Sequence, residues 1–204
     1  MPLPNGVTPF GAIEATCPNA KWLGNRGILH TADGKIVKQW DRKAWVTCEL
    51  RYGNRNRRPL MQPGRYSELF FLDEATALAA GHRPCGECRH ARYIDFKAAW
   101  MRAHHSACGI GDIDRMLHSD RIAENRQKRM HISSIVELPV GVVFEREGEP
   151  FLITNAGVRR WSATGYLPLE PIEDAFEVVN VLTPRSLVDV IRAGYSPEMH
   201  PSTG

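Results

Sequence analysis

The segment Cys85-Gly86-Glu87-Cys88 is the feature that most constrains how this chain folds. Two cysteines separated by two residues lie on one tight turn, where both thiolates can approach a single tetrahedral metal ion at about 2.3 Å. The chain has three other cysteines, Cys17, Cys48 and Cys108, and they are widely spread. An odd number of cysteines with one close pair does not indicate a disulfide framework and favours a metal site, most simply for zinc.

The residues before the cysteine pair predict a strand, a short helix and a rigid turn. Residues 68–72 have the apolar character of a strand, and Asp73 is a suitable N-cap for a helix over 74–80. Gly81 suits the left-handed position that ends such a helix. We therefore expect a compact strand–helix–turn unit that holds the two cysteines in place.

A second, longer helix is expected after the pair, over residues 89–103. Its apolar residues Tyr93, Phe96 and Trp100 fall on one stripe, which is typical of a helix packed on a core. A redox-active cysteine pair of the thioredoxin type would follow a strand directly. This pair follows a helix and an Arg-Pro turn, so metal binding is the preferred interpretation.

The segment 68–88, ELFFLDEATALAAGHRPCGEC, resembles the second half of the Ada-type zinc domain. In that family a strand, a short alanine-rich helix and a knuckle of the form Ala-Gly-aromatic-Arg-Pro-Cys-x-x-Cys supply two of four cysteine ligands. The resemblance implies that Cys85 and Cys88 bind Zn²⁺ in a small zinc-stabilised module. The matching positions are Phe70, Phe71, Ala77, Leu78, Ala79, Ala80, Gly81, Arg83, Pro84, Cys85 and Cys88.

The first half of the Ada-type motif is not present. The family's first two cysteines, one of which accepts a methyl group from a DNA phosphotriester, fall by register at about Asn54 and Arg58. Neither side chain binds zinc, so methyl transfer by the family's mechanism is not expected here.

The remaining metal ligands must come from elsewhere, and Cys48 and His30 are the leading candidates. Cys48 lies in an alternating segment, 45–52, that we expect to pair as a strand with 68–72 and to face the knuckle. Its alternative role is that of a small buried core residue. His30 follows a turn-rich segment, and its alternative role is that of a structural histidine with satisfied hydrogen bonds. Cys17 and Cys108 are weaker candidates.

A basic segment, RYGNRNRRP, suggests contact with nucleic acid. It places Arg51, Arg55, Arg57 and Arg58 on or beside one loop, which could bind the phosphates of DNA or RNA. A second basic segment spans 121–131. Either segment is also explained by a solvated surface, and the net charge of +3 does not by itself require a nucleic-acid partner.

Two other classes of function stay open. One is a metal-dependent nuclease or other hydrolase, because histidines and acids of the middle segment could hold a metal ion. No established catalytic motif accompanies them, so the catalytic residues stay unknown and enzymatic activity stays uncertain. The other class is a structural or partner-binding module. The residues considered for a nuclease are His104, His105, His118, His131, Asp112, Asp114, Asp120 and Glu124.

The chain as a whole predicts an α+β protein with a zinc-stabilised strand–helix–knuckle module and a mostly β C-terminal part. We expect an Ada-like part over 1–105 and a C-terminal part over 112–204, which can also pack as a single domain. The C-terminal part should contain strands at 141–145, 150–154, 158–162 and 176–182, then a helix capped by Thr183. No apolar run is long enough to span a bilayer, and no export signal is evident, so a cytoplasmic, bacterial-type protein is expected.

Overall fold

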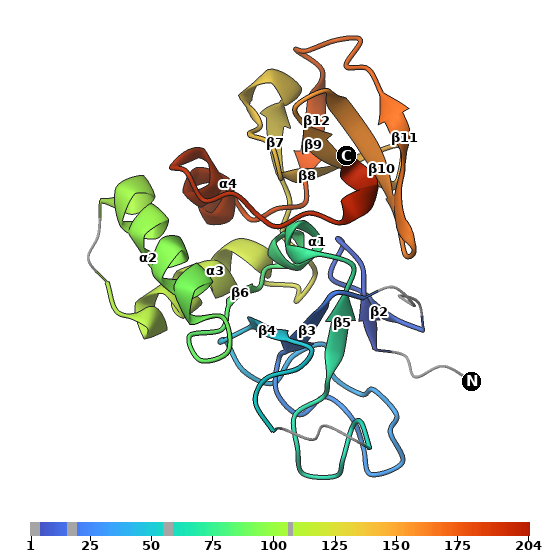
Figure 1. Cartoon of the computed structure of the whole chain (residues 1–204), viewed down its shortest axis with the longest axis vertical. Helices are drawn as coiled ribbons and strands as arrows, with labels where there is room; N and C mark the ends of the chain where they lie inside the picture. Colours follow the sequence, from blue (N-terminus) through green and yellow to red (C-terminus); the bar gives the residue numbers. More distant parts are fainter. Residues whose placement is uncertain (1–4, 16–19, 55–58, 106–107) are drawn as a thin grey trace.

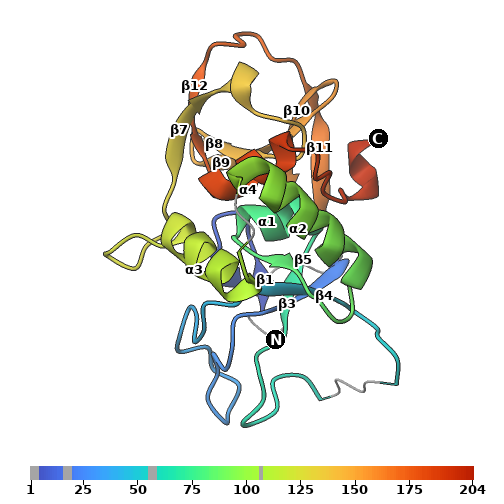
Figure 2. The same ribbon diagram turned by 90° about the vertical axis from the view of Figure 1, so that its left-hand side faces the viewer.

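The computed structural model describes residues 5–15, 20–54, 59–105 and 108–204. Across these residues the chain forms four α-helices and two six-stranded sheets, which confirms the predicted α+β class. The first sheet occupies the lower part of the molecule in Figure 1 and the second sheet the upper part. The helices lie between the sheets and along one side (Figure 2).

The first sheet positions the cysteine pair. Its strand order is β2-β1-β5-β3-β4-β6, with β4 antiparallel to β3 and parallel to β6. Arg83 and Pro84, which were predicted to form a turn, instead form the short strand β6 beside β4. Because β6 leads directly into the knuckle, the knuckle begins beside β4. The strands are β1 Gly6–Val7, β2 Ile13–Glu14, β3 Trp22–Asn25, β4 Val46–Glu49, β5 Leu69–Phe71 and β6 Arg83–Pro84.

The short helix α1, Glu74–Ala79, forms as its sequence predicts. The side chain of Asp73 accepts a hydrogen bond from the backbone N–H of Thr76 at 2.8 Å, which satisfies one of the free donors of the first turn. Gly81 follows the helix with φ of +87°, a conformation that favours glycine because it has no Cβ. The chain then turns into β6 and the cysteine pair.

The second sheet makes the C-terminal part mostly β, as predicted. Its order is β11-β10-β9-β8-β12-β7, and all its neighbouring strands are antiparallel. The strands are β7 His131–Ser134, β8 Val143–Arg146, β9 Glu149–Thr154, β10 Gly157–Ser162, β11 Gly165–Glu170 and β12 Val178–Val181. The other elements are α2 His90–His104, α3 Ile110–Arg121, α4 Arg185–Arg192 and the 3₁₀ turns Ile135–Glu137 and Pro201–Thr203.

One hydrophobic core joins residues from both parts of the chain. Phe96 and Trp100 of α2 are fully buried and belong to the same cluster as Val181 of β12 and Leu187 of α4. The predicted stripe on the first long helix is therefore the face that packs on this core. The expected boundary between 105 and 112 falls in the link from α2 to α3.

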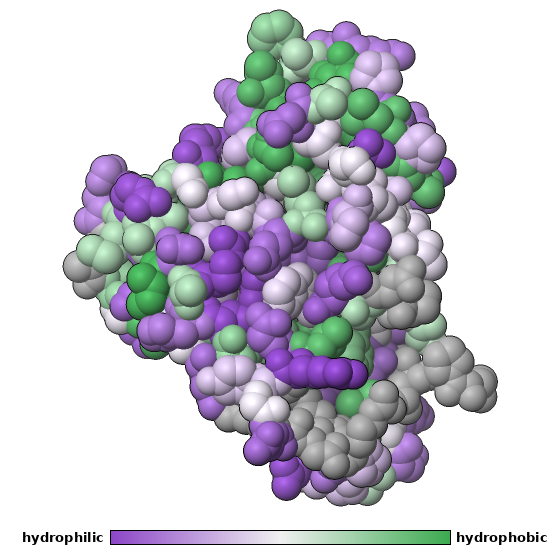
Figure 3. Space-filling model, in the orientation of Figure 1, coloured by the Kyte–Doolittle hydropathy of each residue, from purple (hydrophilic) through white to green (hydrophobic). Residues whose placement is uncertain are grey.

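A buried carboxylate also joins the two parts. Glu74 of α1 is fully buried and accepts hydrogen bonds from Arg89, Arg92, the Tyr195 hydroxyl and the backbone N–H of Glu198. On the face shown in Figure 3, hydrophilic residues gather over the middle of the molecule, and hydrophobic residues gather over the second sheet. Polar contacts thus accompany the apolar core where the two parts meet.

Several local predictions are wrong. The segment 35–40 follows the turn dipeptide Asp33-Gly34, and its sequence predicts a strand, but it forms only a single bridge, between His30 and Ile36. The sequence also predicts one basic helix over 112–132, but α3 ends at Arg121, because the chain turns there and pairs Ile122 with Lys128. Thr183 does not cap α4; its hydroxyl accepts a hydrogen bond from the backbone N–H of Val143 at 3.0 Å.

Within the residues that the structure describes, no helix has the length and apolar character needed to cross a membrane.

Candidate metal centre

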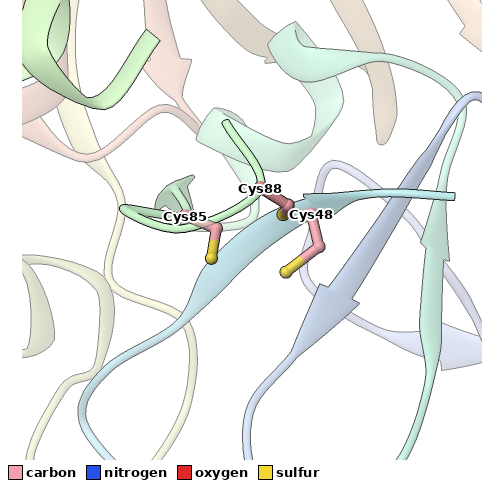
Figure 4. Close-up of side chains that lie close together, drawn as sticks. All are labelled: Cys48, Cys85 and Cys88. Carbon is pink, nitrogen blue, oxygen red and sulfur yellow. The ribbon is translucent and has the colours of Figure 1, made fainter. Parts of the chain in front are cut away.

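Three cysteines come together beside the first sheet. The sulfur atoms of Cys48, Cys85 and Cys88 all lie within 4.8 Å of one another, and the three residues are half-buried. Figure 4 shows Cys48 on β4 facing the turn that carries the other two cysteines. Thiolates around one zinc ion lie about 3.8 Å apart when each zinc–sulfur distance is about 2.3 Å. The group can therefore hold a metal ion after small movements of the side chains.

Backbone hydrogen bonds fix the knuckle against β4. The backbone N–H of Cys85 donates to the carbonyl of Thr47 at 2.9 Å, and that of Arg89 donates to the carbonyl of Cys85 at 3.2 Å. The backbone N–H of Glu49 donates to Cys88 Sγ at 3.4 Å. Such N–H donors stabilise a thiolate and orient it, as the outer shell of a metal site does. The sequence around the cysteine pair does not predict these roles of Thr47 and Glu49, because both residues act through backbone atoms.

The pKa values of the three thiols are shifted in different directions. A hydrogen bond from the Cys48 thiol, helped by the backbone N–H groups of Glu87 and Cys88, lowers the pKa of Cys85 to about 5. The same hydrogen bond, followed by burial, raises the pKa of Cys48. Burial is the main cause that raises the pKa of Cys88. One thiolate therefore forms readily, and a bound cation would compensate the charge of the other two.

Cys48 reaches the knuckle by a route different from the predicted one. The prediction that its segment faces the cysteine pair is confirmed, but the predicted pairing with 68–72 is wrong. In the sheet, β3 lies between β4 and β5, and β4 pairs with β3 on one side and β6 on the other. Residues 1–30 are rich in glycine, proline and asparagine, so their sequence predicts irregular structure and not β3, which left β5 as the expected neighbour of β4.

His30 is not part of the cysteine group. Its Nδ1 lies 2.5 Å from Ser67 Oγ, and its Nε2 lies 3.3 Å from the carbonyl oxygen of Gln62. Both ring nitrogens thus have protein partners, which agrees with the structural role considered for this histidine. Among the residues that the structure describes, the metal-binding group consists of the three cysteines alone.

The predicted basic loop is described only in part. Arg51 is exposed and lies two residues beyond the end of β4. Arg55, Arg57 and Arg58 lie outside the described residues, and so does Cys17. The loop starts directly after the strand that carries Cys48.

The histidines and acids considered for a nuclease do not form a second metal-binding group among the described residues. Several of them have other partners. Asp114 accepts two hydrogen bonds from the guanidinium of Arg83, at 2.7 and 2.8 Å, and both side chains are buried. Asp120 accepts from the backbone N–H of Ser186 at 3.1 Å. These acids stabilise the fold in the positions where the structure places them.

Comparison of the chain with protein-family models, with curated proteins and with solved structures finds no match.

Proposed function

We propose that the protein is a zinc-stabilised nucleic-acid-binding protein that does not carry out Ada-type methyl transfer. The observation that carries the proposal is the convergence of Cys48, Cys85 and Cys88 from two separate segments. Three sulfur ligands favour zinc over magnesium or calcium, which prefer oxygen ligands. The resemblance of 68–88 to the Ada-type zinc knuckle supports the same metal.

The position of the three cysteines indicates which segments a bound metal ion would connect. A zinc ion bound to Cys48 would join the end of β4 to the turn before α2, two segments that backbone hydrogen bonds and the side chain of Arg89 hold together in the described structure. A structural zinc site has four ligands, so the fourth position is taken by another side chain or by solvent. Closure by a side chain gives a purely structural site.

Elemental analysis of the purified protein tests the metal. We expect about one zinc ion per chain. Cys48→Ser and Cys85→Ser should each lower the zinc content and the midpoint of thermal unfolding. Cys108→Ser is the matched control, because Cys108 is partly buried but lies outside the group, and it should retain zinc. Wild-type protein that is metal-free and yet fully stable would contradict the proposal.

Two further variants identify the fourth ligand. His30→Ala should keep its zinc, because the ring nitrogens of His30 already contact Ser67 and Gln62. Cys17→Ser reports whether that cysteine completes the site. Loss of zinc in Cys17→Ser indicates a closed site, whereas retention in both variants leaves the fourth position to a different side chain or to solvent.

The position of the basic loop supports the nucleic-acid part of the proposal. The loop begins with the exposed Arg51, just after the strand that zinc would fix, and its sequence continues with Arg55, Arg57 and Arg58. Arginine side chains beside the strand that zinc would fix can bind the phosphates of a nucleic acid.

Binding measured against salt concentration tests this part. We expect affinity for single- or double-stranded DNA or RNA to fall steeply as salt increases. For duplex DNA, Arg51→Ala should reduce the slope of log K against log salt by about 0.9, the value for one phosphate contact. Arg160→Ala, which removes an exposed arginine of β10, should leave the slope unchanged. No binding to any of these nucleic acids at low salt would refute the nucleic-acid role and leave the zinc site standing.

A further inference from the structure

A cavity of about 550 Å³ lies between the first sheet and the end of α3, away from the cysteine group. In Figure 2 α3 stands above the loops that join β3 to β4, and Arg121 donates to the carbonyl of Lys43 in that segment. Four cationic side chains line the cavity. They are Arg26, Arg121, Arg126 and Lys128.

The cations of this cavity have no carboxylate among the described residues that line it. Arg26 and Arg121 are each only 1% exposed, although an arginine is almost never buried without an acidic partner. Arg121 donates to the backbone carbonyls of Gly81 and Lys43, and Arg26 donates to that of Gly11. Asp114, the acid that acts on Arg121 electrostatically, is already paired with Arg83.

Both buried arginines retain unused donors. Arg26 Nη2 and Arg121 Nε have no hydrogen-bond partner among the described residues. The two guanidinium groups lie over the indole ring of Trp45, with Cζ at 4.2 and 3.9 Å from the ring centre. Cation–π contacts offset part of the desolvation cost of each charge, but they leave the positive charges of the two groups uncompensated.

Lys128 adds a third cation at the same place. Its ammonium group donates to the backbone carbonyl of Ala79 at 2.6 Å. Burial, followed by the charges of Arg26 and Arg121, lowers the pKa of Lys128 to about 7. The fold thus brings basic side chains together at a cavity with no acid among its described lining residues, which is typical of an anion-binding site and not of a solvated surface.

From this geometry we propose that the cavity binds the phosphate group of a small phosphate monoester of nucleotide size. A doubly charged oxyanion would pair with the clustered cations and accept hydrogen bonds from Lys128 and from the exposed Arg126, which line the cavity. The cavity is larger than a phosphate ion needs and falls within the usual size range of small-molecule sites. Apolar side chains that can contact the organic part of the ligand also line it, namely Phe10, Trp40, Ile122 and Met130.

Calorimetric titration of the full-length protein with AMP, adenosine and orthophosphate tests the site. We expect AMP to bind saturably, one molecule per chain, and adenosine to bind at least tenfold more weakly. Orthophosphate that binds as tightly as AMP would support the same site with the free anion as its ligand. An oligonucleotide that needs a 5′-phosphate to compete with AMP would support it with a nucleic-acid end as the source.

Charge-removing variants localise the binding. Lys128→Gln should weaken AMP binding by about tenfold or more, the usual effect of losing a charge-assisted hydrogen bond. Arg126→Ala should also weaken binding, and its exposed side chain makes it a change that the fold tolerates. Arg129→Ala is the matched control: it is exposed and adjacent to Lys128, and it does not line the cavity.

Two results would overturn the proposal. One is the absence of saturable binding of both AMP and orthophosphate to the wild-type protein. The other is an equal loss of affinity in Arg129→Ala and Lys128→Gln, which would indicate general attraction to basic surface. The AMP test does not depend on the proposed nucleic-acid role. Arg51 does not line the cavity, so Arg51→Ala should not change AMP binding.

Discussion

Replacement of Glu74 by glutamine should remove a large part of the stability of this protein. The carboxylate is fully buried and its two oxygens accept four hydrogen bonds. Oε1 accepts from Arg89 Nη1 at 2.9 Å and from the Tyr195 hydroxyl at 2.5 Å. Oε2 accepts from Arg92 Nη2 at 2.8 Å and from the backbone N–H of Glu198 at 2.9 Å.

Glutamine has nearly the same shape but replaces one oxygen by an amide NH₂ group. With the amide NH₂ in the place of Oε2, Arg92 and the Glu198 N–H both face a donor; in the place of Oε1, Arg89 does, whereas the Tyr195 hydroxyl can turn and accept. Arg89 is also buried, and among the described residues its remaining acidic partners are Glu198 and Glu49. Removing one partner of a buried ion pair costs about 3–5 kcal/mol, compared with total stabilities of about 5–15 kcal/mol.

Urea denaturation of Glu74→Gln, followed by circular dichroism, measures this cost. The control is Asp189→Asn, which breaks an exposed ion pair with Arg192 and should cost at most about 1 kcal/mol. Both variants should be compared in the presence of zinc and after chelation. A difference between the two variants smaller than about 1 kcal/mol would refute the view that Glu74 is a principal link between the two parts of the chain.

Two further predictions concern the backbone and the pH dependence. Gly81→Ala should lower the free energy of unfolding by more than about 2 kcal/mol, because φ is +87° and an added Cβ would lie 2.5 Å from Arg121 Cδ. Gly64→Ala, at φ of +75° with open space around it, should cost only about 1 kcal/mol, and equal losses in chemical denaturation would contradict this reasoning. The folded-state pKa of Lys128, about 7, lies below the value of about 10.4 in an unfolded chain, so the unfolded state binds more protons between them. Stability should therefore rise from about pH 7 to about pH 10 more steeply in the wild type than in Lys128→Met, and parallel profiles would contradict the assigned burial.

Local sequence patterns predicted the helix α1 and the antiparallel strands of the C-terminal part. Asp73 and Gly81 mark the ends of α1 through capping and a left-handed backbone, and both signals act over a few residues. The turn at Glu147-Gly148 likewise joins β8 to β9, which correspond to the strands predicted at 141–145 and 150–154. β11 had no such signal and was missed, because its alternation of buried and exposed residues is weak.

The candidate sites depended on contacts that no local pattern contains. Cys48 was selected from its alternating segment, but its approach to the knuckle required β3 to insert between β4 and β5. The sequence singled out the basic segment 121–131, which contains Arg121 and Lys128, but it did not indicate that Arg26, far away in the chain, joins them at one cavity. Arg26 and Arg121 meet at Trp45 because α3 packs against the loop before β4.

The partners of Glu74 also determine when this protein can fold during its synthesis. The carboxylate belongs to an early helix, but two of its four donors, Tyr195 and Glu198, follow it by 121 and 124 residues. Until those residues leave the ribosome, the Glu74 carboxylate lacks two of its donors. Burying it then is unfavourable, so packing of α1 into the core is disfavoured. Contacts of such long range also slow folding. The N-terminal sheet should therefore reach its final packing only after residues 195–198 have emerged, and the nascent chain must stay soluble until then.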